Sequence, residues 1–333
     1  MSETDPVKIL TTLQTIFSTE KIFDLLKLPD KTVNELYSFK VKNKKFIIKI
    51  LTRPPISEMD NFRLEKEANL MKRFTSRNKT ISSSSKDSCF VPVPEIRYIE
   101  NETKNIGYKF NIMSFVEGQS LNVAWEKMTT EVKSQIIAEF AKIVSNIHGL
   151  KFDMFGDIEE YSCPRRFYSL TNMLKTNSRR YTGMLGTSKL LPVKLVSQAQ
   201  NFIESNLDKA KFVANPYLVH SDLHPKNVIV IKQDTWKINA ILDFEWSYAA
   251  DPLFDLFDIE KDWMLDSDLL KIFLNNYSLD KKLDLDDYRL EEKIFKMISL
   301  LATITVGWVF FHPTEENITR VKDNISKILT SKV

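Results

Sequence analysis

Residues 218–230 read LVHSDLHPKNVIV and place a histidine, an aspartate, a second histidine and an asparagine between two apolar runs. His220, Asp222 and His224 alternate, so in an extended segment their side chains would lie on one side. Three ligand types at this spacing could hold zinc, which usually takes three or four protein ligands. A polar turn between two strands is a second interpretation, since Asp, Asn and Pro are common turn residues. The third interpretation is the catalytic loop of an enzyme.

The polar loop is the first part of a longer series of motifs. His220-x-Asp222-x-x-x-x-Asn227 is followed by a short β-favouring run and then by Ile-Leu-Asp-Phe at 241–244. This series resembles the catalytic and metal loops of the protein-kinase-like fold, which read H-x-D-x-x-x-x-N and then D-F-G. The loop HSDLHPKN and the segment ILDFEWSYAADPLFDLF are similar to the aminoglycoside phosphotransferase and choline kinase group, whose patterns are H-x-D-x-H-x-x-N and I-D-F-E/D…D-P…D-L. The HRD and DFG of a protein kinase are absent.

The resemblance covers nearly the whole chain. FIIKI resembles the third strand of that fold, which carries the nucleotide-binding lysine and places it at Lys49. LEKEANLMKRF resembles the following helix, whose glutamate pairs with that lysine, and alignment on Glu-Ala places it at Glu67. Glu65 is two residues away and therefore about 200° around the helix, so only one of the two can face Lys49. VPVPEI and IMSFVEGQSL resemble the next strand and the segment that joins the lobes.

The resemblance implies transfer of the γ-phosphate of ATP to a hydroxyl group with Mg²⁺, a reaction that needs positioning and charge neutralisation more than covalent work by the protein. Lys49 would contact the α and β phosphates, and Glu67 would hold its side chain. Asp222 would orient the acceptor hydroxyl and take its proton. The other implied roles are magnesium ligation by Asn227 and Asp243, loop support by His220 and His224, and adenine binding by the backbones of Ser114 and Val116.

A scarcity of glycine early in the chain is the main departure from the family pattern. The first of the seven glycines is Gly107, and the seven form neither GxGxxG nor GxxxxGK[ST], which argues against a Rossmann dinucleotide site and a Walker phosphate loop. The kinase-like fold normally covers the phosphates with a glycine-bearing turn in its first hairpin. The matching residues here, LPDKTVNELYSF, would have to shape that turn with Asp30, Lys31, Thr32 and Asn34. Nucleotide affinity and the choice of ATP over GTP are left open.

We look for the acceptor site in an acidic run that follows the metal segment. Residues 251–268 hold six Asp and one Glu against a single lysine. Acids beside aromatic faces suit a cationic hydroxyl compound, an amino sugar or an amino alcohol, through charge pairing and cation–π contact. A solvated helix face with core tryptophans is an equal alternative, and basic residues at 164–180 keep an anionic or neutral acceptor open. The candidate acceptor residues are Glu245, Trp246, Asp255, Asp262 and Trp263.

The composition restricts the class of protein and its partners. The chain has 333 residues, 43% hydrophobic and 27% charged, as in an ordinary soluble globular protein. Its net charge of +3 is scattered, which argues against nucleic acid as the main partner. The start, MSETDPVKIL, does not resemble a secretory signal, the apolar stretch 297–311 is short for a membrane span, and the two distant cysteines lack CxxC spacing. We expect a cytoplasmic monomer or homodimer without a membrane partner.

Hydrophobic periodicity predicts the elements that must position these residues. Apolar residues at helical spacing predict a helix within 6–28, and two β-favouring runs predict a hairpin over 36–51. Residues 57–74 predict an amphipathic helix, and the serine-rich stretch 75–88 a surface loop. From Leu121 onward helical periodicity dominates, except for β-rich runs within 217–245.

The expected fold class is α+β, a two-lobed protein-kinase-like fold. It would combine a small antiparallel-sheet lobe, with one principal helix and an N-terminal helix, and a larger, mainly helical lobe. The predicted division is a nucleotide-binding lobe over 1–113, a hinge over 114–118 and a helical lobe with the catalytic loop and acceptor site over 119–333. A choline- or ethanolamine-type kinase, a non-catalytic nucleotide-binding module and a metal-dependent hydrolase are the alternative functions.

Overall fold

The computed structural model describes residues 4–18, 20–29, 34–52, 62–81, 90–158, 165–263, 266–278, 284–310 and 313–331. The chain divides into two compact units. The first unit combines Met1–Gly149, His220–Ser247 and Asp262–Ser278, and the second combines Leu150–Val219, Tyr248–Lys261 and Leu279–Val333. The polar loop HSDLHPKN (220–227) and the segment ILDF (241–244), here called the Asp-Phe segment, therefore belong to the same unit as the N-terminal sheet.

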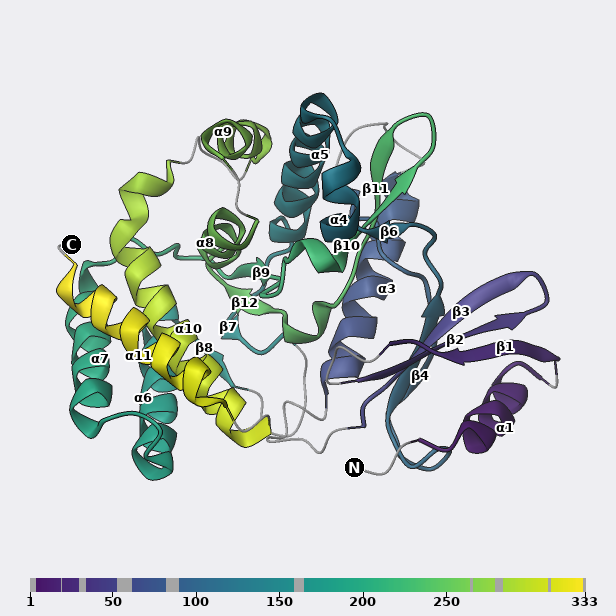
Figure 1. Cartoon of the computed structure of the whole chain (residues 1–333), viewed down its shortest axis with the longest axis horizontal. Coiled ribbons are helices and arrows are strands. Elements are labelled where there is room, and N and C mark those ends of the chain that lie inside the picture. Colours follow the sequence, from purple (N-terminus) through teal and green to yellow (C-terminus); the bar gives the residue numbers. More distant parts are fainter. Residues whose placement is uncertain are drawn as a thin grey trace. The chain divides into compact units, whose positions relative to one another are not determined.

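An antiparallel five-stranded sheet in the order β1-β2-β3-β5-β4 forms the framework of the first unit (Figure 1). The predicted hairpin consists of β2 (Glu35–Val41) and β3 (Lys44–Ile50), which pair from Glu35↔Ile50 to Val41↔Lys44. Strands β4 (Ile96–Glu100) and β5 (Phe110–Ser114) continue the sheet on the far side of β3. Buried aromatic and aliphatic side chains of β2, β3 and β5 pack against the N-terminal helix in one cluster.

The N-terminal helix is shorter than the sequence periodicity predicts. Helix α1 covers Pro6–Ile16 and buries Ile9 and Leu13. Asp5 precedes the helix as its N-cap, and its carboxylate accepts a hydrogen bond from the Val7 amide. The expectation of a helix reaching toward residue 28 is wrong, because β1 (Ile22–Lys27) pairs with β2 instead. Residues 22–27 gain a ladder of main-chain hydrogen bonds by this pairing, and the helical spacing of their apolar residues does not reveal it.

The principal helix of the first unit ends seven residues later than the predicted end at residue 74, and residues 57–61 of the prediction lie outside the described residues. Helix α3 covers Arg63–Ile81 and buries Leu64, Ala68, Leu70, Met71 and Phe74. The predicted loop within 75–88 is wrong over 75–81, where the helix continues, and 82–88 lie outside the described residues. The polar residues of this extension have specific partners, since the Asn78 side chain exchanges hydrogen bonds of 2.8 and 3.1 Å with the Val91 backbone.

The rest of the first unit holds the polar loop. Strands β6 (Gln119–Ser120), β10 (Val228–Lys232) and β11 (Trp236–Ile241) form a small sheet in the order β11-β10-β6. Short helices α4 (Leu121–Ala124) and η1 (Trp125–Lys127) lead into α5 (Thr130–His148), which packs against α9 (Ser267–Asn276). The turn η3 (Pro225–Asn227) precedes β10, and η4 (Phe244–Trp246) follows β11. The two motifs thus flank one hairpin.

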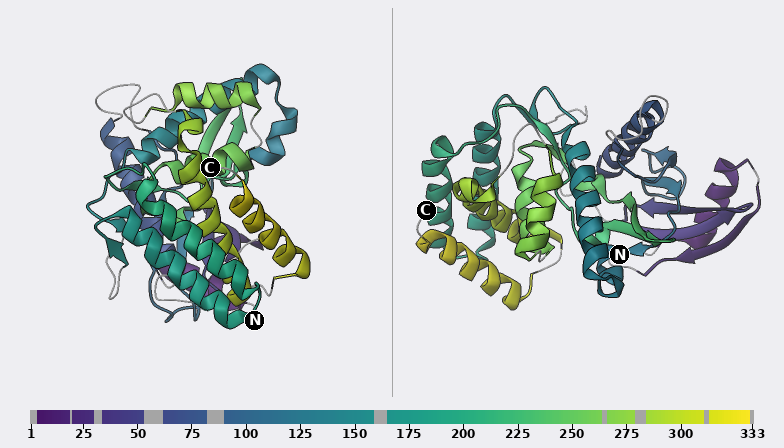
Figure 2. Two further views of the ribbon diagram at one scale, coloured as in Figure 1. Left: turned by 90° about the vertical axis from the view of Figure 1, so that its left-hand side faces the viewer. Right: turned by 90° about the horizontal axis from the view of Figure 1, so that it is seen from above.

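The second unit is mainly helical. Helices α6 (Leu170–Ser188), α7 (Val193–Asn206), α10 (Arg289–Phe310) and α11 (Glu315–Thr330) pack on one another around a buried apolar cluster (Figure 2). The unit also contains a four-stranded sheet of β7 (Phe155–Gly156), β8 (Arg166–Phe167), β9 (Tyr217–Val219) and β12 (Tyr248–Ala250), together with η2 (Leu207–Lys209), α8 (Leu253–Asp262) and η5 (Leu285–Tyr288).

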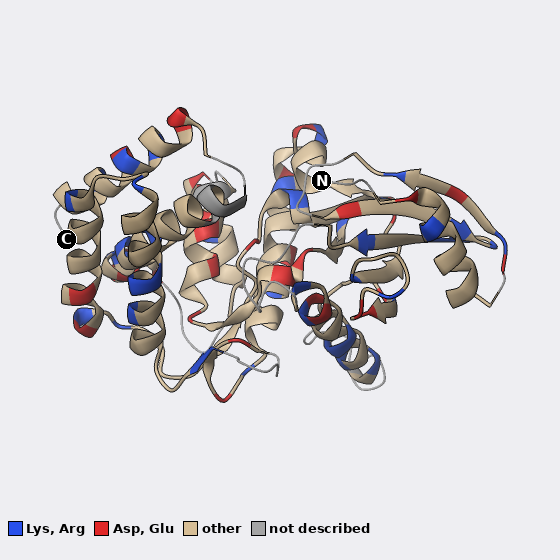
Figure 3. Ribbon diagram, turned by 90° about the horizontal axis from the view of Figure 1, so that it is seen from below, with Lys and Arg blue, Asp and Glu red and all other residues tan. Residues whose placement is uncertain are grey.

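The apolar stretch 297–310 lies within α10, whose residues Met297, Leu301 and Ile304 are buried in the helical cluster. Among the described residues, no helix is long and apolar enough to cross a membrane. Basic and acidic residues are interspersed within each unit (Figure 3). The antiparallel sheet and the helical second unit agree with the predicted α+β class.

Candidate active site

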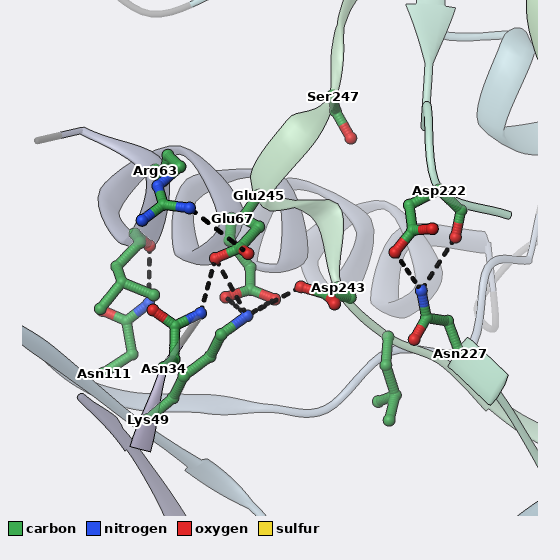
Figure 4. A network of polar contacts seen from close by, with 12 residues as sticks. Asn34, Lys49, Arg63, Glu67, Asn111, Asp222, Asn227, Asp243, Glu245 and Ser247 are labelled. Atoms are coloured by element: carbon green, nitrogen blue, oxygen red, sulfur yellow. Dashed lines mark hydrogen bonds and ion pairs between the residues drawn. The ribbon is translucent and has the colours of Figure 1, made fainter. Parts of the chain in front are cut away.

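Lys49 is the centre of a buried cluster of charges in the first unit (Figure 4). Its side chain leaves strand β3 between apolar neighbours and is 7% exposed. Its Nζ lies 3.0 and 3.2 Å from the two carboxylate oxygens of Glu67 on α3 and 2.9 Å from Asp243 Oδ1. A third carboxylate, Glu245, lies 3.4 Å away. Lys49 is therefore buried among carboxylates and does not point into solvent.

The helix register decides which glutamate contacts Lys49. Glu67 is buried together with the apolar face of α3, whereas Glu65 is half-buried. Two residues correspond to about 200° around a helix, so Glu65 points away from the sheet when Glu67 faces it. Glu67 is therefore the partner of Lys49.

The electrostatics of the cluster follow from burial and charge. Burial raises the pKa of Glu67 to about 7, with Asp243 and Glu245 adding to the effect and Lys49 opposing it. Burial alone would lower the pKa of Lys49, but its carboxylate neighbours outweigh burial and raise it well above the usual value. Burial would also raise the pKa of Asp243, yet the ammonium of Lys49 holds it below the usual range. The three carboxylates therefore favour the charged form of Lys49.

Asp243 is held in an unusual backbone conformation between β11 and η4. Its φ of 70° and ψ of 54° are left-handed, a region that Asp and Asn tolerate better than other non-glycine residues. The preceding residue is fixed on both sides, because the Leu242 amide donates to the Asn227 carbonyl and the Leu242 carbonyl accepts from His220 Nε2 at 3.0 Å. These bonds tie the polar loop to the Asp-Phe segment.

His220 and His224 have supporting positions in the loop. His220 is fully buried; its Nε2 donates to Leu242 and its Nδ1 accepts from the Asp222 amide at 3.3 Å. With both ring nitrogens bonded in the loop, His220 is placed to support it rather than to accept a proton. His224 is half-buried, and its Nδ1 accepts from the Lys226 amide at 3.2 Å, which caps η3.

Asp222 has the most accessible carboxylate of the motif residues. Its side chain is 28% exposed, and one oxygen accepts from Asn227 Nδ2 at 2.8 Å. The same Nδ2 donates to the Asp222 carbonyl at 2.9 Å, and Lys226 Nζ lies 3.5 Å from the carboxylate. In Figure 4 the Asp243 side chain lies between Lys49 and the Asp222–Asn227 pair. The Asp222 carboxylate is therefore partly exposed to solvent.

The oxygen donors in this region suit magnesium better than zinc. Among the described residues, no group of three His, Cys, Asp or Glu side chains is arranged to hold a metal ion. The alternation of His220, Asp222 and His224 therefore gives no zinc site there. Asn227 uses its amide nitrogen on Asp222, which leaves its oxygen to accept, and Asp243 contributes a carboxylate. Oxygen-only donors of this kind fit Mg²⁺.

The predicted adenine-binding segment follows β5. The Ser114 amide donates to the Glu95 carbonyl at 2.9 Å, and the Ser114 hydroxyl accepts from the Glu95 amide. A base could therefore use only the carbonyl of the Ser114 backbone. Val116 lies in the extended segment between β5 and β6, whose Phe115 amide donates to the Lys45 carbonyl at 3.0 Å.

The described candidate acceptor residues of the first unit have separate partners. Glu245 belongs to the Lys49 cluster, and the Trp246 ring faces the Arg63 guanidinium at 4.9 Å. Trp263 is buried, stacks on Phe140 at 3.9 Å between ring centroids and donates to the Leu223 carbonyl. Asp255 is buried in the second unit. The Asp262 side chain lies outside the described part of the chain, as do Asp30, Lys31 and Thr32.

Arg63 is a site residue that the sequence analysis missed. It is buried at the first position of α3, and its guanidinium nitrogen lies 3.8 Å from a Glu245 oxygen. A cation at a helix N-terminus opposes the helix dipole, so a nearby carboxylate is needed to compensate it. An arginine at the start of a helix that carries a predicted site residue was the available signal.

The comparisons with known proteins decide the family. Residues 32–290 match the model of the phosphotransferase enzyme family. The chain belongs to this family. Membership confirms the prediction, made from the polar loop and the Asp-Phe segment, of a phosphotransferase that uses an alcohol group as acceptor. A search of the curated proteins finds no match.

Solved structures confirm the predicted kinase-like fold of this phosphotransferase. The aminoglycoside phosphotransferase APH(4)-Ia is 13% identical over 99% of this chain and 100% of its own, with a TM-score of 0.70. A thermostable mutant of that enzyme, in complex with ADP and hygromycin B, is 13% identical over 97% and 98% of the two chains, with a TM-score of 0.67. The gentamicin complex of APH(2'')-IIa is 15% identical over 100% and 98%, with a TM-score of 0.62.

Proposed function

We propose that this phosphotransferase moves the γ-phosphate of a nucleoside triphosphate, with Mg²⁺, to a hydroxyl group of a small molecule. ATP is the proposed donor, and GTP is the alternative to test beside it. The observation that carries the proposal is the contact of Lys49 with Glu67 and Asp243, in the same unit as the Asp222 loop. Solved structures of the same fold hold ADP and AMP-PNP, which supports a nucleotide as donor.

The residues of the cluster have separate roles in this proposal. The Lys49 ammonium neutralises phosphate charge, and Glu67 keeps its long side chain in one orientation. Asp243 and Asn227 would hold the magnesium ion, which neutralises phosphate oxygens when bound. Asp222 accepts a hydrogen bond from the acceptor hydroxyl, orients it and takes its proton. His220 and His224 keep the loop in shape, and the backbones of Ser114 and Val116 bind the base.

The net charge of the cluster supports a divalent cation. The pKa of Glu67 is raised to about 7, so above that pH the three carboxylates of Glu67, Asp243 and Glu245 face the positive charges of Lys49 and Arg63. A buried excess of negative charge is costly unless a cation compensates it. A magnesium ion would reverse the sign of the excess and so favour a polyanionic triphosphate.

The acceptor class to test first is the amino sugars. Two of the similar structures hold hygromycin B and gentamicin, which supports a search among aminoglycosides. We propose that residues 1–113 bind the nucleotide, that 114–118 form a connection and that 119–333 carry the catalytic loop and the acceptor site, although the loop segment 220–247 belongs to the same compact unit as the N-terminal sheet. The monomeric or homodimeric state and the cytoplasmic location stay predictions.

A coupled assay of nucleotide turnover tests the proposal. The purified chain, with Mg²⁺ and either ATP or GTP, is presented with aminoglycosides, macrolides, choline, ethanolamine and sugars. We expect phosphorylation of at least one compound, detected by a mass increase of one phosphate, and no transfer by Asp222→Asn. Nucleotide binding without transfer to any compound would instead favour a non-catalytic module, and undiminished transfer by Asp222→Asn would refute the assigned mechanism.

A further inference from the structure

Glu245 connects three segments that surround the proposed phosphate site. Its Oε2 accepts a hydrogen bond from Asn34 Nδ2 at 2.9 Å and lies 3.4 Å from Lys49 Nζ. Its Oε1 lies 3.8 Å from an Arg63 guanidinium nitrogen. Asn34 directly precedes β2, Lys49 is on β3 and Arg63 begins α3. One side chain in η4 thus contacts the residue that precedes β2, the lysine of β3 and the first residue of the principal helix α3.

The contacts of Glu245 are buried, so their loss costs more free energy than the loss of exposed contacts would. Glu245 is 3% exposed, and Asn34 and Arg63 are each 2% exposed. Hydrogen bonds to a charged group are stronger than neutral ones, and more so away from water. Lys49 also loses one of three carboxylate neighbours if Glu245 is neutralised. The position of the Lys49 ammonium therefore depends on Glu245 as well as on Glu67.

The position of Asn34 explains what its hydrogen bond to Glu245 could contribute to the nucleotide site. The kinase-like fold normally covers the phosphates with a glycine-bearing turn, whereas this chain has no glycine before Gly107. Without glycine, the backbone cannot reach the left-handed conformations of a tight turn at low cost. A buried side-chain anchor can fix the position of the chain at the start of β2 instead. Asn34 directly precedes β2, and its side-chain amide donates to Glu245.

We propose that Glu245 is a positioning residue for the nucleotide. It holds Lys49 and the entry to the first hairpin, through Asn34, in the arrangement that binds the triphosphate. Glu245 was predicted as an acceptor residue, whereas its contacts in the structure are with Lys49 and Asn34. The inference rests on the proposed function, since it concerns the nucleotide of that reaction.

Nucleotide affinity tests the proposal without knowledge of the acceptor. Thermal-shift titration with AMP-PNP and Mg²⁺ gives an apparent Kd for the wild type, Glu245→Gln and Asn34→Ala. We expect each substitution to weaken binding by about tenfold, as loss of a charge-assisted hydrogen bond predicts. Glu139→Gln is the matched control, since this half-buried carboxylate of the same unit accepts from the Ile238 amide. Its Kd should stay within about twofold of wild type.

Three further measurements separate positioning from a general effect on folding. KM for the nucleotide should rise in Glu245→Gln while kcat, for transfer or for basal hydrolysis, changes less than about threefold. The double variant with Asn34→Asp and Glu245→Gln exchanges the donor and the acceptor of this hydrogen bond. Its Kd for AMP-PNP should therefore rise by less than the product of the factors by which the two single substitutions raise it. The unfolding temperature without nucleotide identifies a variant that has lost its fold.

Unchanged Kd values in folded Glu245→Gln and Asn34→Ala would overturn the inference and leave the proposed function intact. A loss confined to kcat, or strictly independent effects of the two residues, would overturn it as well. A wild-type chain that binds none of AMP-PNP, ATP and GTP would instead overturn the proposed function, and the inference with it.

Discussion

Lys49 and Asp243 are 194 positions apart in the chain, and 2.9 Å separates Lys49 Nζ from Asp243 Oδ1. Both residues belong to the first compact unit, because the segment 220–247 returns to the N-terminal sheet. This single ion pair joins the strand motif FIIKI to the ILDF motif. The predictions below test what it and its neighbours do.

Substitution of Asp222 by asparagine should separate chemistry from binding. The amide that Asp222→Asn introduces can still accept from Asn227 Nδ2 but cannot take the acceptor proton. We expect transfer to fall by about 10²–10⁴-fold in kcat, with nucleotide affinity and unfolding temperature close to wild type. Single-turnover assays measure the transfer, and thermal-shift assays measure the nucleotide affinity and the unfolding temperature. Asp234→Asn, in the exposed β10–β11 turn, is the control, and more than a tenth of wild-type transfer by Asp222→Asn would contradict the role of a base.

Removal of the central cation should destabilise the fold. Lys49→Met leaves three carboxylates of a buried cluster without their shared ammonium. Breaking a buried ion pair from one side costs about 3–5 kcal/mol. Urea denaturation monitored by tryptophan fluorescence measures the loss. Combining Glu67→Gln with Lys49→Met should recover part of the lost stability, because it removes one of the unpaired buried carboxylates.

Lys40→Met provides the matched control for Lys49→Met. Lys40 pairs with Asp24 at 2.7 Å, but both side chains are about half exposed. An exposed pair contributes about 0–1 kcal/mol, so the control should be nearly neutral. Equal costs for the two substitutions would mean that the Lys49 cluster is not tightly buried in solution.

Glu67 should make the stability depend on pH in a defined direction. Its pKa is raised from 4.5 to about 7, first by burial and also by Asp243 and Glu245. Between these values the folded chain holds a proton that the unfolded chain has released, so the protonated group favours folding. This contribution is fully present below pH 4.5 and is lost as the pH rises through 7.

The pH prediction is measured as a difference between wild type and Glu67→Gln. The free energy of unfolding of wild type relative to the variant should fall by up to about 3 kcal/mol from pH 4.5 to 8. Urea unfolding at intervals of one pH unit gives the curve. Glu95→Gln, at an exposed pair with Arg97, should follow wild type throughout. A difference that is constant or that rises with pH would contradict the raised pKa.

Gly118 should be intolerant of any side chain. Its φ of 132° is a conformation that L-residues rarely adopt, and an added Cβ would lie 2.4 Å from the Val230 carbonyl oxygen. Gly118→Ala should therefore cost on the order of 3 kcal/mol through backbone strain and displacement of β10 from β6. Gly183→Ala is the control, because open space surrounds that position in α6 and alanine is the better helix former. Similar unfolding midpoints for the two variants would contradict the prediction.

Much of the fold could be predicted from local patterns. The β2–β3 hairpin follows from two β-favouring runs around a polar turn, and the amphipathic spacing of α3 indicates which helix face is buried. That spacing allows only one of Glu65 and Glu67 to face the sheet, and the structure shows that Glu67 is the one that contacts Lys49. The end of α1 could not be predicted, because pairing of β1 with β2 outweighs the helical spacing of residues 17–28.

The order of chemically competent residues is what the sequence itself determined: a strand lysine, a helix glutamate, an aspartate loop and a second aspartate. Their types restrict the chemistry to charge neutralisation and proton transfer. Only the tertiary structure decided that Glu245 lies beside Asn34, Lys49 and Arg63, and that Trp263 is committed to the Leu223 carbonyl and the Phe140 ring. Periodicity reports which side of an element is buried, whereas a contact between distant segments depends on how those segments pack.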